Sequence, residues 1–325
     1  MTSSSTSSLA PKRVLVIHYS QTGQLTALAE QIVAPLRADP HITVQVETLR
    51  PLPAYPFPWP FFRFFDAFPE SAHLRPPPLA PLSLTGDESF DLVILPYQVW
   101  FLAPSPPITA FLKHPVAQRL LAGKPVVSVI ACRNMWLTAH EKFQTLLAAT
   151  GARLIDNVVL TDTGGTMGTF FTTTVWMLSG RKAGFWGLQD AGLTDAQIQS
   201  GRRFGRALVE GLGADREKTG EPLLAGLGAV HADPRLYFGE RTGTRSFYFW
   251  GLLIMAAGQP GSWQRRPLLA LYVAFLVAII VTVLPVSLGL QALLRPFLKQ
   301  RLSRMKHQFE RPSGSATHRC HLYEE

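Results

Sequence analysis

The feature that most constrains this chain is a run of 27 residues, Leu268 to Leu294, without a charged side chain or a histidine. At about 1.5 Å per residue, a helix of this length covers roughly 40 Å, whereas the hydrocarbon core of a bilayer is about 30 Å thick. Basic residues flank the run at Arg265, Arg266 and Arg295. The alternative is a buried core helix, but such a helix is rarely apolar on every face over this length. The run therefore predicts a main apolar helix in contact with a membrane.

The overall charge indicates which partners to expect. The chain has 325 residues and a formal net charge of +9, and many of its basic residues lie in the tail 295–325, beside the apolar run. Basic residues in this position gain about 1 kcal/mol each from anionic lipid headgroups. We therefore expect a membrane with anionic lipids, and no nucleic acid, as the partner. Cys132 and Cys320 lack metal-ligand spacing, so no metal site is expected.

The N-terminal residues bear on localisation. Residues 1–12 are rich in serine and threonine and contain no apolar core of a secretion signal. We expect a disordered N-terminus and a domain that faces the cytoplasm at the cytoplasmic (inner) membrane. The path of the apolar run stays open. A single span would place the basic tail outside, against the positive-inside tendency, whereas a break at Pro285 would give a re-entrant element with both ends inside.

Residues 13–214 alternate between two kinds of apolar pattern. Short apolar segments predict strands over 13–19, 42–48, 90–95, 125–131 and 153–160, and helical spacing predicts helices over 24–36, 107–121 (interrupted at Pro115), 136–149 and 194–212. Such alternation predicts an α/β fold, a doubly wound parallel five-stranded sheet with helices on both faces. Residues 215–245 are interpreted as a connector. Residues 246–294 form a predicted membrane-associated region, which begins with a short interfacial helix.

An insertion rich in proline and aromatic residues, residues 51–87, separates the second and third predicted strands. Proline lacks an amide donor, so the stretch up to Pro60 is expected to be neither an ordinary helix nor a central strand. Rings this numerous would promote aggregation if they were exposed. They are expected either to shield a ligand or enter the lipid interface, or else to complete the domain's own core.

The residues after the first strand predict an anion site. Ser20-Gln21-Thr22-Gly23-Gln24 lies between a strand and a helix, where backbone N–H groups and the helix dipole converge. The hydroxyls of Ser20 and Thr22 can donate to phosphate oxygens, and Gly23 permits close approach of the backbone. The alternative is an ordinary helix N-cap.

This loop resembles that of the flavodoxin-like family, whose pattern Ser/Thr-x-Thr-Gly-x-Thr binds the phosphate of FMN. The match covers Ser20, Thr22 and Gly23, whereas Leu25 stands where the family favours threonine and Thr26 follows it. The resemblance implies the fold predicted above, with FMN as the cofactor. It also implies that the residues of this loop, Thr26 included, bind the cofactor.

The resemblance extends to the loop after the third strand, which in the family lies along the flavin ring. Here this loop contains Tyr97, Gln98, Val99, Trp100 and Phe101. The aromatic contact is expected from Tyr97, Trp100 or Phe101, which offer the stacking surface that a flat ring needs. The two loops meet at the carboxyl ends of neighbouring strands. FMN is therefore expected in preference to NAD, whose glycine-rich fingerprint is missing.

The loop after the fourth strand supplies further candidates, Cys132, Arg133 and Asn134. It also lies at a carboxyl end and is expected to face the flavin. Arg133 would stabilise an anionic reduced flavin or a substrate oxyanion. No catalytic residue can be assigned from these patterns, and Arg133 and Cys132 are the candidates for that role. The alternative for Cys132 is a small buried hydrophobic residue.

Over nearly its full length the chain also resembles the bacterial dialkylresorcinol condensing enzyme family, through VLVIHYSQTGQ, YPFPWPFFRFFD, YQVWFL, ACRNMW and the apolar helix. This resemblance implies a role in resorcinol-type lipid synthesis. A flavin site fits redox work there better than carbon–carbon bond formation, which needs an activated cysteine beside histidine. We expect a membrane-attached FMN-dependent oxidoreductase that acts on a lipid-soluble cyclic, aromatic or quinone-like substrate. A homodimer or a redox partner protein, an electron-carrier function and a non-catalytic membrane scaffold all stay open.

Overall fold

Five parallel strands form the central sheet, in the order β2-β1-β3-β6-β7. The computed structural model describes residues 11–323, so the expected disordered N-terminus lies outside this range except at its end. The strands are β1 (Lys12–His18), β2 (Ile42–Thr48), β3 (Leu92–Tyr97), β6 (Pro125–Cys132) and β7 (Arg153–Thr161). This is the strand order of flavodoxin-like doubly wound sheets. The predicted fold class is confirmed.

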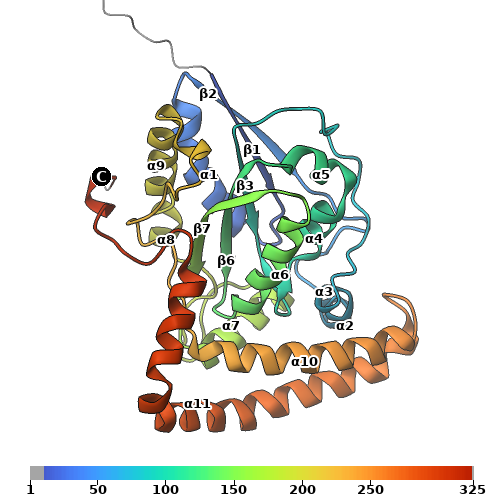
Figure 1. The fold of residues 1–325 in the computed structure, drawn as a ribbon. Helices are drawn as coiled ribbons and strands as arrows, with labels where there is room; N and C mark the ends of the chain where they lie inside the picture. Colours follow the sequence, from blue (N-terminus) through green and yellow to red (C-terminus); the bar gives the residue numbers. More distant parts are fainter. Residues whose placement is uncertain (1–10, 324–325) are drawn as a thin grey trace, which may run out of the picture.

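Helices cover both faces of the sheet (Figure 1). On one face lie α1 (Gln24–Ala38), α8 (Asp195–Gln199) and α9 (Arg202–Gly213), and on the other lie α4 (Pro106–Lys113), α5 (Pro115–Leu121) and α6 (Leu137–Ala148). The break at Pro115 is as predicted. The predicted helix 194–212 is instead two helices, which meet at Gly201. The approach of α9 to α1 requires glycine, because a Cβ on Gly205 would lie 2.1 Å from the Ile32 carbonyl oxygen.

The insertion is ordered, and several of its rings are buried in the interior of the protein, whereas a role at a ligand or at the lipid interface stays a prediction. It is extended up to Pro60 and continues as α2 (Phe61–Asp66) and α3 (Phe68–Ala72). Phe65 and Phe68 belong to a second apolar cluster, together with residues of the C-terminal helices. A short hairpin, β4 (Val99–Trp100) and β5 (Ala103–Pro104), follows β3.

A helix that the sequence patterns did not predict follows β7. It is α7 (Thr166–Ser179), of sequence TMGTFFTTTVWMLS. Threonine, valine and aromatic residues are poor helix formers, and the segment shows no clear apolar period. Residues 162–165, which include Gly164 and Gly165, form the turn between β7 and this helix.

Two long helices form the layer of the molecule farthest from β2 (Figure 1). They are α10 (Arg235–Ala256) and α11 (Arg266–Glu310), and the short 3-10 helix η2 (Trp263–Arg265) precedes α11. The start of α10 corrects the predicted connector, which was expected to run to residue 245. Among the described residues one helical stretch, Trp263–Thr282, is long and apolar enough to cross a membrane.

The residues after α11 belong to the α/β domain, which corrects their interpretation as a separate basic tail. Phe309 and Tyr323 are buried in the same core cluster as the sheet. The Val230 amide donates to the Gly314 carbonyl at 3.1 Å. The Ser313 hydroxyl donates to the buried Asp156 carboxylate at 2.7 Å. Residues 309–323 and the part of the predicted connector around Val230 therefore complete the domain, although the sequence patterns had placed both segments outside it.

Candidate functional site

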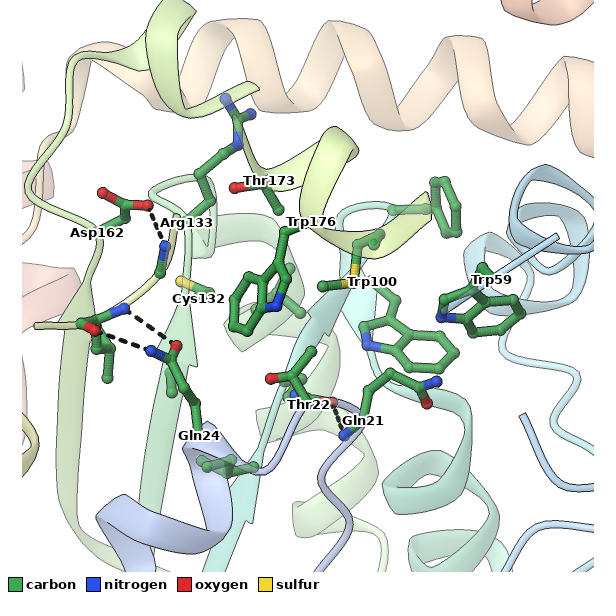
Figure 2. A pocket seen from close by; sticks show the side chains of 18 of the residues that line it. Gln21, Thr22, Gln24, Trp59, Trp100, Cys132, Arg133, Asp162, Thr173 and Trp176 are labelled. Carbon is green, nitrogen blue, oxygen red and sulfur yellow. Dashed lines mark hydrogen bonds between the residues drawn. The ribbon is translucent and has the colours of Figure 1, made fainter. Parts of the chain in front are cut away.

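A cavity of about 230 Å³ opens at the carboxyl ends of β1, β3 and β6 (Figure 2). Open α/β sheets bind ligands at this position, where the loops of neighbouring strands diverge. Loops after four strands, the insertion and α7 all contribute to its lining. The lining residues are Gln21, Thr22, Gln24, Leu25, Trp59, Phe64, Ala67, Gln98, Val99, Trp100, Phe101, Ala131, Cys132, Arg133, Asp162, Thr173, Trp176, Met177, Gly192 and Leu193.

The first turn of α1 faces this cavity with free backbone donors. The first helical hydrogen bond runs from the Ala27 amide to the Gly23 carbonyl, so the amides of Gln24, Leu25 and Thr26 have no partner within the helix. No side chain caps this end of α1. Gly23 adopts a left-handed conformation with φ of 84°. The helix dipole adds partial positive charge, so this turn fits an anionic group.

Two glutamines hold the loop in place through backbone groups of distant segments. Gln24 donates from Nε2 to the Leu193 carbonyl at 2.8 Å and accepts from the Leu193 amide at 3.1 Å. Gln21 donates to the Pro56 carbonyl at 2.6 Å. Both side chains therefore position the loop. Both residues also line the cavity, and the expectation that they bind the cofactor stays a prediction.

Aromatic rings form one wall of the cavity. Trp100 of β4 lies 5.6 Å from Trp59 and 5.0 Å from Tyr55, measured between ring centroids. Figure 2 shows the Trp176 indole projecting from α7 into the cavity, between Cys132 and Trp100. Flat apolar surfaces of this kind suit an aromatic ring system.

The opposite end of the cavity is polar and buried. Asp162 accepts from the Gly164 amide at 2.8 Å and from the Gly192 amide at 2.7 Å, which ties the β7 loop to the segment after α7. Burial lowers the pKa of Arg133, partly offset by the neighbouring Cys132 and Asp162. Burial raises the pKa of the Cys132 thiol far above neutral. The thiol therefore stays protonated, which fits the interpretation of Cys132 as a small buried residue and not as a nucleophile.

Four expected ligand contacts do not line the cavity. Tyr97 is fully buried on the other side of β3, stacked on Phe143 and 3.1 Å from Nδ1 of His140. The Thr26 hydroxyl lies 3.3 Å from Nε2 of His18. The Ser20 hydroxyl accepts from the Gly23 amide at 3.1 Å and thus shapes the loop. Asn134 is also outside the lining.

The structure also brings in residues that the sequence analysis missed. Trp176, Thr173 and Met177 come from the unpredicted helix α7, and Leu193 lies well beyond it. Trp59 belongs to the insertion, for which the sequence analysis singled out no individual ring. No motif marks these positions.

Comparison with known proteins finds similar solved structures. No protein-family model and no curated protein matches the chain. Similar solved structures include a Lactobacillus acidophilus flavoprotein in complex with FMN, at 16% identity and TM-score 0.35, over 46% of this chain and 93% of that protein. A flavodoxin from the domain Archaea is 12% identical, with TM-score 0.34, over 62% of this chain and 98% of that flavodoxin. Oxidised flavodoxin 1 of Bacillus cereus is 14% identical, with TM-score 0.32, over 61% of this chain and 97% of that flavodoxin. The fold assignment rests on the strand order.

Proposed function

We propose that the chain is an FMN-dependent oxidoreductase that acts on a lipid-soluble cyclic, aromatic or quinone-like substrate at a membrane. The observation that carries this proposal is the uncapped first turn of α1, which opens into the same cavity as a wall of tryptophan rings. One end of the cavity fits an anion and the adjoining wall fits a flat ring. FMN combines these two features in one molecule.

Each group of lining residues has a distinct role in this proposal. The amides of the first turn of α1 and the Thr22 hydroxyl would hold the phosphate. Trp100 and Trp176 would cover the ring plane and exclude water. The Arg133 guanidinium would stabilise negative charge on the reduced ring or on a substrate oxyanion, since a buried cation gains most from an anionic neighbour. The bound flavin itself would supply the hydride or electron transfer.

The apolar character of the rest of the cavity supports a lipid-soluble substrate. Phe64 and Ala67 of the insertion line it, and the neighbouring Phe61 and Phe62 of α2 are exposed. The chain therefore has an apolar surface close to the cavity, as a substrate drawn from a bilayer would require. In resorcinol-type lipid synthesis, the fitting step is dehydrogenation of a cyclic dione lipid to the aromatic ring.

The first test is the absorption spectrum of the purified full-length protein, followed by titration with FMN and with riboflavin. We expect a flavin spectrum, and tighter binding of FMN than of riboflavin because only FMN carries the phosphate. Protein that neither contains FMN nor binds it when supplied would overturn the proposal. Steady-state turnover with NAD(P)H and a short-chain quinone, without any partner protein, would exclude a pure electron carrier.

A further inference from the structure

The C-terminal helices expose an apolar surface that no other described part of the chain covers. Exposed apolar side chains occur on α2, α10 and α11, among them Phe61, Phe62, Phe249, Leu253, Leu271 and Val281. On α10 the exposed positions recur every three to four residues and form a stripe that faces away from the domain. We call these exposed faces of the three helices the platform. An apolar surface this extended marks an interaction site.

The exposed charges of α10 and α11 are all of one sign. Between residues 235 and 311 the acidic residues are Glu240 and Glu310, and both are buried. The exposed Arg241, Arg245 and Arg266 have no ion pair with any described acidic side chain. Arg266 lies over the Phe62 ring at 5.8 Å, so cationic and apolar groups adjoin. A bilayer with anionic headgroups complements this combination, whereas a second copy would bring cations against cations.

Both ends of α11 are attached to the same domain. At its start, the buried Arg265 donates to Glu70 at 2.7 Å and to Asp66 at 3.1 Å, both in the insertion. At its end, the Phe309 ring packs 6.4 Å from Trp136, and the following residues pair with the domain core. Figure 1 shows α11 running beneath α10 and then turning towards the domain. A single span would instead separate these two ends by the bilayer.

We propose that the platform binds in the plane of an anionic lipid surface, with α11 lying along the interface and the C-terminal residues on the same side as the α/β domain. This inference deepens the proposed function, because it names how the membrane is reached. It chooses the arrangement with both ends on one side over a single crossing. It does not depend on flavin binding, so the two proposals can fail separately.

Vesicle flotation of the full-length protein tests the surface. We expect flotation with vesicles that contain phosphatidylglycerol, weaker flotation with phosphatidylcholine alone, and loss of the difference at high salt. Leu271→Glu should weaken partitioning about tenfold or more, since it replaces an apolar contact with a like charge to the lipid. Leu322→Glu is the matched control, because Leu322 is 61% exposed and Leu271 is 57% exposed, but Leu322 lies outside the platform.

Circular dichroism shows whether Leu271→Glu is folded. Val281→Glu is a second platform variant, which tests the proposal if the first variant misfolds. Equal flotation of the platform variants and the control would overturn the proposal. Failure of the wild-type protein to float with any vesicle would also overturn the proposal. The same holds if light scattering shows that the wild-type protein forms a dimer through the platform and does not bind vesicles.

Accessibility labelling tests the arrangement of the two ends. The Cys132→Ser variant leaves Cys320 as the single thiol, which reports on the C-terminal residues. Ala214→Cys, combined with Cys132→Ser and Cys320→Ser, places the single thiol on the domain. We expect a membrane-impermeant maleimide to label both sites in inside-out vesicles and neither in intact right-side-out ones. Labelling of the two sites from opposite sides would establish a crossing and overturn the in-plane arrangement.

Discussion

The side-chain amide of Gln24, the first residue of α1, hydrogen-bonds both backbone groups of Leu193, at 2.8 and 3.1 Å. These residues are far apart in sequence, and their contact closes the rim of the cavity between the first loop and the segment that follows α7. Gly192 makes the contact possible, because a Cβ there would lie 2.4 Å from the Gln24 Oε1 atom. The anion-binding turn and the Trp176 wall are thereby held as one unit.

Gln24→Glu is expected to break this contact. A carboxylate cannot donate to the Leu193 carbonyl and repels it, so the free energy of unfolding should fall by about 1–3 kcal/mol. Hydrogen exchange should increase around residues 190–193. Gln144→Glu, on an exposed position of α6, is the control and should change neither measurement. Equal urea midpoints for the two variants would show that the contact adds nothing to stability.

Gly23→Ala should weaken the binding of FMN but not of riboflavin. Gly23 has φ of 84°, and an L-residue in this region costs roughly 1–2 kcal/mol, so the loop shifts to relieve the strain. About a tenfold loss of FMN affinity is expected, from 1.4 kcal/mol per factor of ten. Gly213→Ala is matched to it, since a Cβ meets nothing within 4 Å at either position, but Gly213 lacks the positive φ. Fluorescence titration measures both ligands. A parallel loss for riboflavin would place the phosphate elsewhere.

His140 should make the protein less stable in acid. Burial lowers its pKa to about 4, so the folded state holds the ring neutral while the unfolded chain titrates near 6.5. Its contribution is therefore present above pH 6.5 and is lost as the pH falls towards 4, by about 3 kcal/mol in total.

His140→Gln should lose this part of the pH dependence, as urea unfolding at pH 7 and pH 4 would show. Buried Asp156 and Glu240 also titrate, each with a pKa raised to about 7 by burial. Their contribution has the opposite sign, because it is present below the unfolded pKa and is lost as the pH rises. Because Asp156 and Glu240 are present in both the variant and the wild type, their contribution cancels when the two proteins are compared. An unchanged difference between the two pH values would mean that His140 is protonated without cost.

Ser313→Ala should destabilise the whole α/β domain. The Ser313 hydroxyl donates to Asp156 and accepts from the Asn157 amide at 2.8 Å, both in the middle of β7. Loss of the serine leaves buried groups unpaired, at a cost of about 1–3 kcal/mol. Ser303→Ala, on an exposed turn of α11, should be neutral. Urea unfolding and limited proteolysis measure the effect. Cleavage of the tail without any loss of domain stability would contradict the docking.

The sequence alone determined the features that depend on local patterns. Apolar runs and helical spacing located the five strands and most of the helices around them, because the sheet's parallel strands are buried on both faces and the α/β helices are amphipathic. The Ser20 to Gln24 turn was likewise visible, since a helix that starts directly after a strand needs a glycine at the turn. Pro115 marked a helix break by its own covalent geometry.

Only the tertiary structure decided which residues meet. Tyr97 and Trp100 are near neighbours in sequence, yet Tyr97 contacts α6 whereas Trp100 lines the cavity, because successive residues of a strand point to opposite faces and the chain turns after β3. α7 forms despite poor helix propensity, and Thr169, Thr172 and Trp176 are buried on one side of it, because tertiary packing adds to the stability of a helix. The return of the C-terminal residues to β7 rests on contacts across more than a hundred residues, such as Ser313 with Asp156, which no local pattern records.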